Sequence, residues 1–322
     1  MSRSTFNVYK LYFKTALHLS KGKNNSYESS EGVLHSDTLK SAVYVSLRQL
    51  FDDEQLVDAF MNDVTLSSAF PFVDKMDNTE FWLPRPLTYR HPNEKEYPDL
   101  RKQYKDVAYV TTLQMAQILR GENPSDFLDD ENKANQPEIW KRDTTQRVKI
   151  NYDEDSDPFY LEKMYPKDNL NRGLYFIVQG EFDTNKFEAA LKLLADNGIG
   201  LQRSLGNGQF SFKKEEMTID LPDNAQSWVT LSLFRPKRED VVPILDSSNY
   251  QFIKRGGWIS SPEDEQFLSL RKQSIMMFTE GSVFAFNDAP TKGVVENIRP
   301  VWNNDDLHPI YRDGKAIFLP IQ

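Results

Sequence analysis

The sequence predicts an α+β protein in which strands and helices form split β-α-β units, and three patterns lead to this fold class. Residues 9–19 alternate between apolar and polar side chains, as a strand with one solvent-exposed face does. Residues 36–50 repeat apolar side chains at helical spacing. Residues 174–178 form an apolar strand that leads into the best-patterned helix of the chain, at 184–195.

The N-terminal strand is followed by a polar loop at 20–30 and by a helix that begins at Ser36. Serine is a favourable N-cap because its hydroxyl accepts a hydrogen bond from a free amide of the first turn. Asp37 adds negative charge at the positive end of the same helix. A second helix is expected at 52–60, so the N-terminal region gives the first half of a split β-α-β unit.

A second regular unit begins at Gly173 and has the order β-α-β-β-α-β, which is that of a ferredoxin-like fold. Its expected elements are strands at 174–178, 210–213, 228–234, 250–254 and 275–286, with helices at 184–195 and 239–245. A last strand is expected at 316–320. We therefore expect a domain at 1–165, with an insertion at about 89–165, and a second ferredoxin-like domain at 166–322.

The region 89–170 is polar and broken by prolines, with one expected helix at 112–120, and it reads as a long irregular insertion or arm. We expect this arm to project toward a neighbouring subunit. The acidic run 153–158 resembles the start of a calcium loop, but Pro158 stands at the required glycine and Met164 at the closing glutamate. We interpret it as a solvated acidic turn.

Composition limits the possible functions. The 322 residues include no cysteine, which excludes disulfides and thiol catalysis and fits a cytoplasmic protein. No apolar run is long enough to span a membrane, so we expect no membrane association. The formal net charge of −9 means that any nucleic-acid contact must be a local basic patch on an acidic body.

A glycine-rich loop at 197–210 follows the helix at 184–195 and is the first candidate site. Gly198, Gly200, Gly206 and Gly208 leave the backbone bare, and Arg203 lies between them, which suits a phosphate chain. The loop runs from helix to strand, so it is neither a P-loop nor a dinucleotide fingerprint. On spacing alone, a phosphate site and a simple connector are about equally favoured.

Two further segments combine cations with special backbone or aromatic residues. Lys254-Arg255-Gly256-Gly257-Trp258 joins two cations, two glycines and an aromatic ring, which suits a phosphate and a base; a bulge with a core tryptophan is an equal alternative. Arg85 lies between Pro84 and Pro86, which hold the chain extended.

A search for catalytic chemistry gives little. The histidines at 18, 35, 91 and 308 stand apart without a metal-binding motif, and no Gly-x-Ser-x-Gly elbow occurs. We expect no metal and no cofactor. Metal-independent RNA cleavage remains open because it needs only one well-placed base, for which His35 and His18 are the candidates. A histidine that bonds to backbone near a helix start is the favoured alternative.

The order of several motifs resembles the RAMP superfamily of CRISPR-associated proteins, and within it the family of the fourth Csm subunit of type III-A interference complexes. One departure is Leu201, where the family often has a further glycine. The matching segments are Leu34–Leu39, Phe81–Leu87, Gly173–Phe176, Gly198–Gly208, Leu231–Pro236, Lys254–Trp258, Phe278–Ser282 and His308–Gly314.

The resemblance implies two ferredoxin-like domains and a non-catalytic subunit that holds the 5′ tag of the guide RNA in antiviral and anti-plasmid defence. It implies the large polymerase-like subunit and a backbone RAMP subunit as partners, with target RNA nearby. Arg203 and Arg255 would contact phosphate, and Trp258 or Tyr44 would stack a base. The full expected RNA-binding set is His18, His35, Ser36, Lys40, Arg85, Gly198, Gly200, Arg203, Ser204, Gly206, Gly208, Arg255, Gly256, Gly257 and Trp258.

Two rival functions stay open. One is a metal-independent endoribonuclease that processes CRISPR repeat RNA, as some relatives with the same glycine loop do. The other is an assembly subunit whose loop touches no RNA.

Overall fold

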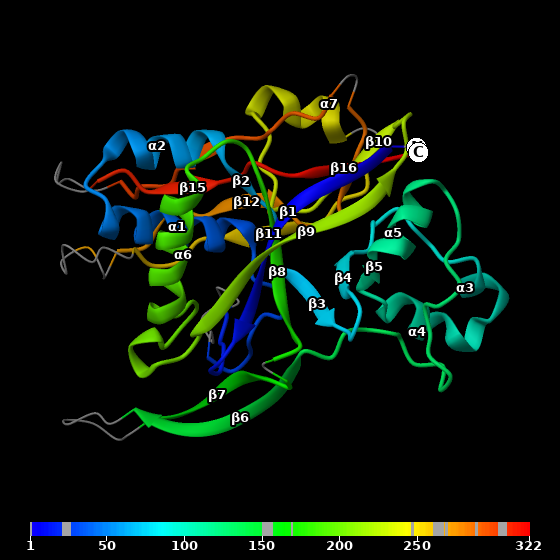
Figure 1. Ribbon diagram of the computed structural model, residues 1–322, viewed down its shortest axis with the longest axis horizontal. Helices are drawn as coiled ribbons and strands as arrows, with labels where there is room; N and C mark the ends of the chain where they lie inside the picture. Colours follow the sequence, from blue (N-terminus) through cyan, green and yellow to red (C-terminus); the bar gives the residue numbers. More distant parts are fainter. Residues whose placement is uncertain are drawn as a thin grey trace.

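A computed structural model describes residues 2–20, 27–149, 157–168, 170–245, 248–259, 267, 270–286, 289–301 and 308–322. Its largest element is a curled antiparallel sheet of seven strands in the order β5-β4-β3-β8-β1-β9, with β2 also paired to β8 (Figure 1). The strands are β1 (Ser2–Phe13), β2 (Thr65–Leu66), β3 (Phe70–Asp74), β4 (Thr79–Pro84), β5 (Tyr109–Thr111), β8 (Arg172–Gln179) and β9 (Phe210–Leu221).

The long strand β1 lies between β8 and the edge strand β9, and both of these neighbours come from the second half of the chain. Tyr9 lies opposite Phe176 of β8 and Lys214 of β9. Helices α1 (Ser36–Leu50) and α6 (Thr184–Asn197) pack against each other and on one sheet face, and α2 (Glu54–Asp63) follows α1. The alternation of β1 divides its side chains between this helical face and the opposite face.

The strands β9-β1-β8-β3, connected through α1 and α6, have the antiparallel order of one split β-α-β-β-α-β unit. This arrangement confirms an α+β fold and corrects the expected division at 165/166. The first strand of the unit pairs with two strands that lie beyond the boundary, so residues 1–165 and 166–322 share one sheet. A strand register that spans 160 residues leaves no local trace in the sequence.

The region 89–170 is more regular than expected. Its first part is a lobe of short elements that packs on the other sheet face, and its second part is a long two-stranded ribbon that extends from the body (Figure 1). The expected helix at 112–120 is present as α5, with a capping box between Thr111 and Gln114. The elements are α3 (Asn93–Glu96), η1 (Pro98–Leu100), α4 (Arg101–Asp106), α5 (Thr112–Leu119), β6 (Trp140–Lys149) and β7 (Asp157–Pro166).

Most of the acidic run 153–158 lies outside the described residues. The predicted irregular arm is therefore corrected to a helical lobe followed by the β6–β7 ribbon. The ribbon escaped notice because β6 is almost entirely charged and polar and so has no apolar alternation to detect, although β7 carries the buried Leu161 and Met164.

Within its described residues, the C-terminal region does not complete a second ferredoxin-like sheet. Its strands form a three-stranded sheet, β13-β10-β16, and two separate pairs, β11–β12 and β14–β15. The expected strand 250–254 is β11, whereas the expected strand 275–286 is divided between β12 and β13. The elements are η2 (Arg203–Leu205), β10 (Ser227–Thr230), η3 (Arg238–Asp240), α7 (Val241–Leu245), β11 (Phe252–Arg255), β12 (Ile275–Phe278), β13 (Val283–Phe284), β14 (Val295–Asn297), β15 (Tyr311–Asp313) and β16 (Phe318–Ile321).

Candidate nucleic-acid interface

The glycine-rich loop between α6 and β9 is held tightly at its base. The amide of Gly198 donates to the carbonyl of Leu194 and closes α6 at 2.8 Å. The amide of Ile199 donates to Gly208 at 3.0 Å, which joins the two arms of the loop. The amide of Gly208 donates to Ala16 at 2.8 Å. The loop is thus fixed both to itself and to the chain that follows β1.

Two of the glycines are required by close backbone contacts inside the protein. A Cβ on Gly208 would lie 1.9 Å from the carbonyl oxygen of Ile199, and one on Gly200 would lie 2.5 Å from the carbonyl oxygen of His18. Both residues also have positive φ. Gly198 is crowded in the same way by Asn207. Packing against protein backbone thus accounts for the glycines at 198, 200 and 208, and contact of these residues with an RNA backbone stays a prediction.

The crest of the loop is different, because it presents unpaired donors. Gln202 adopts the left-handed conformation at φ 60°, and η2 begins directly after it. Among the described residues, the loop amides of Gly200, Gln202, Arg203 and Ser204 have no hydrogen-bond acceptor, whereas those of 198, 199, 201 and 205–209 have one. The side chains of Arg203 and Ser204 are exposed. Successive free amides beside a cation are an arrangement that binds anions.

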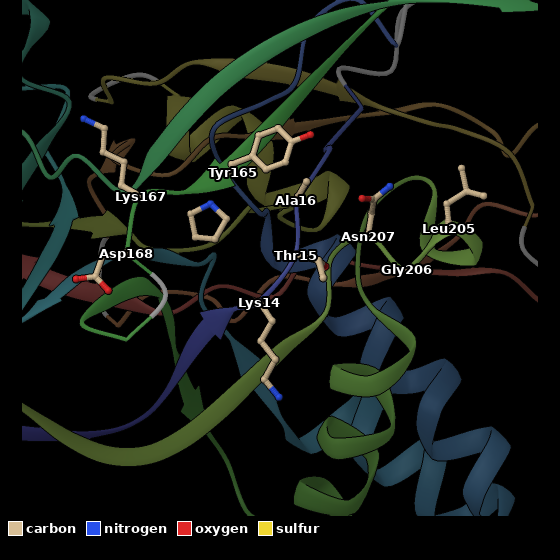
Figure 2. A pocket seen from close by; sticks show the side chains of 10 residues that line it. Lys14, Thr15, Ala16, Tyr165, Lys167, Asp168, Leu205, Gly206 and Asn207 are labelled. Carbon is tan, nitrogen blue, oxygen red and sulfur yellow. The ribbon is translucent and has the colours of Figure 1, made fainter.

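Two clefts flank this crest. The first, of about 840 Å³, lies between the loop, the end of β1 and the foot of the β6–β7 ribbon. In Figure 2, Tyr165 faces this cleft across Ala16 from Asn207, while the side chains of Lys14 and Lys167 extend away on different sides. The second, of about 530 Å³, lies between the crest and α1. Its α1 wall is formed by Ala42, Val45, Ser46 and Gln49.

Arg255 does not extend to solvent as a phosphate contact would. Its guanidinium donates to Asp37 at 3.0 and 3.1 Å and to the Thr38 hydroxyl at 2.8 Å. Asp37 is fully buried and also accepts a hydrogen bond from Arg312. Burial acts to raise the pKa of Asp37, but Arg255 and Arg312 outweigh it and hold that pKa well below its usual range. Arg255 is therefore a structural cation.

The other residues of the segment Lys254–Trp258 include both buried and exposed groups. The carbonyl of Gly256 accepts from Arg312 at 3.0 Å, and its Cα packs beside Ser274. Gly257 has open space above it. Trp258 is 56% exposed, so the alternative of a core tryptophan was wrong.

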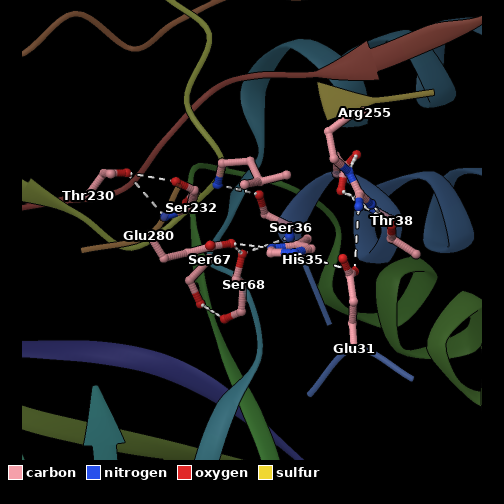
Figure 3. A network of polar contacts seen from close by, with 12 residues as sticks. Glu31, His35, Ser36, Thr38, Ser67, Ser68, Thr230, Ser232, Arg255 and Glu280 are labelled. Atoms are coloured by element: carbon pink, nitrogen blue, oxygen red, sulfur yellow. Dashed lines mark hydrogen bonds and ion pairs between the residues drawn. The ribbon is translucent and has the colours of Figure 1, made fainter. Parts of the chain in front are cut away.

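His35 is buried at the start of α1 between two carboxylates. Figure 3 shows its ring between Glu280 and Glu31, at 2.8 Å from Glu280 and 3.6 Å from Glu31. Burial acts to lower the pKa of His35, but the Glu280 carboxylate outweighs this effect, so the pKa is raised. Ser68 also donates to Glu280. An imidazole enclosed in this way between two carboxylates does not suit a general base for a 2′-hydroxyl.

Ser36 and Lys40 belong to the same buried region of α1. The Ser36 hydroxyl accepts from the amide of Leu233 at 3.0 Å. Lys40 is completely buried and pairs with Asp313 at 3.0 Å. Burial lowers the pKa of Lys40 to about 8, against the opposing effect of Asp313. Neither side chain reaches a cleft, so both expectations of RNA contact are corrected.

The other residues expected to contact RNA also have partners within the protein. His18 is buried, with Nδ1 2.6 Å from the carbonyl oxygen of Glu162. Arg85 donates to the carbonyls of Tyr104 and Lys105 at 2.9 and 3.2 Å. Tyr44 is half-buried against Tyr311, at a centroid distance of 6.5 Å. Of the expected set, Arg203, Ser204, Gly257 and Trp258 are exposed, and Gly200 and Gly206 line the two clefts.

Sequence reasoning missed Lys14, Tyr165, Lys167 and Arg271. Tyr165 and Lys167 belong to the end of the ribbon, which was not predicted, and they reach the first cleft only through the fold. Within the described ranges, no group of three acidic or histidine side chains is arranged to hold a metal. None of the described helices is long and apolar enough to span a bilayer.

Comparisons with known proteins agree with this geometry. Residues 223–321 match the model of the CRISPR Csm4 C-terminal domain. The chain is 25% identical over 304 residues to the CRISPR system Cms protein Csm4 of Mycobacterium tuberculosis (strain CDC 1551 / Oshkosh), covering 92% of this chain and 93% of that one. It is 28% identical over 257 residues to the protein of the same name from Thermococcus onnurineus (strain NA1), covering 77% and 80%.

Solved structures show the same fold. The Csm4-like chain of a Csm3-Csm4 subcomplex in the type III-A CRISPR-Cas interference complex superposes with a TM-score of 0.64 at 20% identity, covering 99% of this chain and 100% of that one. A chain of a Csm1-Csm4 cassette in complex with cA4 gives 0.62, also at 20% identity, with 99% and 98% covered.

The chain therefore shares its fold with chains of these solved Csm complexes. Residues 223–321 belong to the CRISPR Csm4 C-terminal domain family, and the chain is similar to Csm4 proteins over most of its length.

Proposed function

We propose that this chain is a non-catalytic RNA-binding subunit of a type III-A CRISPR effector ribonucleoprotein, which holds the 5′ tag of the guide RNA at the crest of its glycine-rich loop. The observation that carries the proposal is the set of free amides at Gln202, Arg203 and Ser204 beside the exposed Arg203 guanidinium. Such a crest offers directed donors and positive charge to one or two phosphates. The clefts on either side leave room for the adjoining nucleotides.

The proposed partners follow the relatives. Similar chains are found with Csm1 in one solved structure and with Csm3 in another. We infer that this chain docks the large polymerase-like subunit and a backbone RAMP subunit in the cytoplasm, with target RNA nearby. The net charge of −9 supports a body whose surface serves mainly proteins, with RNA confined to a local patch.

The proposed role is non-catalytic because the two candidate bases are enclosed. His18 and His35 are both buried and hydrogen-bonded, and a general base must reach the proton that it removes. Incubation of the purified protein with CRISPR repeat RNA in EDTA should leave the RNA intact. Cleavage that is lost in His35→Ala would overturn this part of the proposal and support the endoribonuclease.

The central test replaces the cation at the crest. Arg203→Ala should weaken binding of a single-stranded RNA that carries the tag sequence, measured by fluorescence anisotropy, and should reduce the salt dependence of binding by about one phosphate contact. Arg101→Ala is the matched control, because Arg101 is an exposed arginine on α4. Equal affinity and equal salt slope for wild type and Arg203→Ala would show that the loop does not hold the RNA.

A further inference from the structure

The corner at which the β11–β12 hairpin meets the first turn of α1 has features that the glycine loop does not explain. The hairpin continues past β11, because the amide of Lys272 donates to Gly257 and the amide of Ile259 donates to Leu270, both at 2.9 Å. These bonds set Trp258 directly opposite Arg271. Ile259 points inward and is buried with Phe267. Alternation along the strand therefore turns Trp258 outward.

Trp258 and Arg271 form an exposed stacked pair. The Arg271 guanidinium carbon lies 4.6 Å from the centre of the indole ring, and the tryptophan is 56% exposed. The exposed indole offers a flat apolar face on which a base can stack. A guanidinium already packed on one face of the ring is oriented in advance, so less side-chain freedom is lost when a ligand binds.

Of the arginines described at the corner, Arg271 is the one that faces solvent. Arg255 and Arg312 share the buried carboxylate of Asp37. Burial and the nearby Arg312 lower the pKa of Lys272 to about 8, so Lys272 lies beside the same buried network. Arg271 is exposed and has no ion-pair partner in the part of the chain that the structure describes. An exposed guanidinium without a described ion-pair partner, on a chain of net charge −9, favours an anionic ligand.

The corner is within reach of the glycine loop along α1. Arg255 donates to Thr38 at the start of this helix, and Ser46 of the same helix lines the cleft beside the crest. Eight residues of α-helix separate these positions, or about 12 Å along the axis. One short single strand can therefore contact both places.

We propose that Trp258 and Arg271 form a second contact site for single-stranded RNA, in which the guanidinium binds a phosphate and the indole stacks on a base. The inference rests on the proposed function, since it extends the path of the RNA that the glycine loop holds. Stacking with cation contacts is how single strands are held without a fixed sequence. Arg271 takes the role that the sequence assigned to Arg255.

The test measures binding of the tag RNA to the full chain by fluorescence anisotropy. Trp258→Ala should weaken binding roughly five- to one-hundred-fold, as loss of one stacked base does, and Trp258→Phe should retain most of it. Arg271→Gln should reduce the salt slope by about one. Lys237→Gln is the control, because Lys237 is exposed on a different part of the surface. Urea midpoints of the variants verify that each one is folded.

The outcomes separate the two assignments. Wild-type affinity in both Trp258→Ala and Arg271→Gln, together with loss in Arg203→Ala, would overturn the corner and leave the loop assignment in place. Loss in the corner variants with no loss in Arg203→Ala would support the corner and overturn the loop. Corner variants that bind RNA normally but no longer bind a partner subunit would show that this face docks a protein, which also overturns the inference.

Discussion

At the scale of single residues, the side chains that attracted notice for RNA binding serve mainly to join the two ends of the chain. Asp37 at the start of α1 bonds to Arg255 of β11 and Arg312 of β15, and His35 bonds to Glu280. These residues are more than 200 positions apart in the sequence. A cation or a histidine that pairs with a carboxylate inside the fold is not accessible to RNA. In this protein Asp37 pairs with Arg255, and Glu280 pairs with His35.

The histidine of this network makes stability dependent on pH. The pKa of His35 is raised in the folded protein, so its contribution is fully present below its ordinary value of about 6.5 and is lost as the pH rises through the folded value. The urea midpoint of the wild type should therefore fall between pH 6 and pH 9 by more than that of His35→Gln. His308→Gln, at an exposed position, should follow the wild type. Parallel pH curves for wild type and His35→Gln would contradict this account.

At the scale of elements, the glycine-rich loop separates into a base that needs glycine and a crest that offers donors. The base brings the amides and carbonyls of Ile199 and Gly208 into contact and fastens the loop to Ala16 and His18. The crest, from Gln202 to Ser204, is held out from this base with its amides free. The glycines of this loop are therefore explained mainly by packing within the protein and less by the ligand that the loop binds.

This division predicts different costs for two glycines of similar conformation. Gly208 and Gly206 have φ values of 74° and 77°, but a Cβ meets Ile199 at 1.9 Å in the first and nothing within 4 Å in the second. Gly206→Ala should cost about 1–2 kcal/mol in unfolding free energy, the strain of the left-handed backbone alone. Gly208→Ala should cost clearly more and also weaken RNA binding. Equal losses in urea denaturation would refute the role given to the base.

At the scale of the whole molecule, one sheet and one buried ionic network connect the N-terminal and C-terminal halves. β1 lies between β8 and β9, and Lys40 of α1 pairs with Asp313 of β15. The Lys315 ammonium in turn donates to the carbonyls of Met61 and Asn62 of α2. The chain therefore folds as mutually dependent parts and not as two successive domains.

Fragments test this dependence. Residues 1–165 lack both neighbours of β1, and residues 166–322 lack the strand that lies between β8 and β9. Each fragment expressed alone should be unfolded or aggregated, as judged by circular dichroism and gel filtration, because an unpaired central strand exposes backbone and apolar surface. Coexpression of the two fragments should restore a soluble complex. A stable, monomeric 166–322 fragment would favour the two-domain division after all.

Much of the local structure could be predicted from the sequence. The helices at 36–50, 184–195 and 112–120 and the strand at 174–178 match α1, α6, α5 and β8, because amphipathic spacing acts within a few residues. The expected cap of α1 was wrong, because His35 is the N-cap residue and the Ser36 hydroxyl accepts from Leu233. The ribbon β6–β7 was missed because β6 is almost entirely polar and shows no alternation. Of the candidate site, Arg203 and Trp258 were found by residue type, and Arg271 was found only through its pairing with Trp258.

The sequence by itself determined the α+β class, the best helices, the glycine-rich loop and the family resemblance, since each depends on residues that are close together in the chain. Only the tertiary structure decided which cations are free. Arg255 pairs with Asp37, His35 pairs with Glu280, and Lys40 pairs with Asp313. These pairings depend on contacts between segments more than 200 residues apart. A buried charge needs a partner, so the fold pairs the interior cations and leaves Arg203 and Arg271 at the surface.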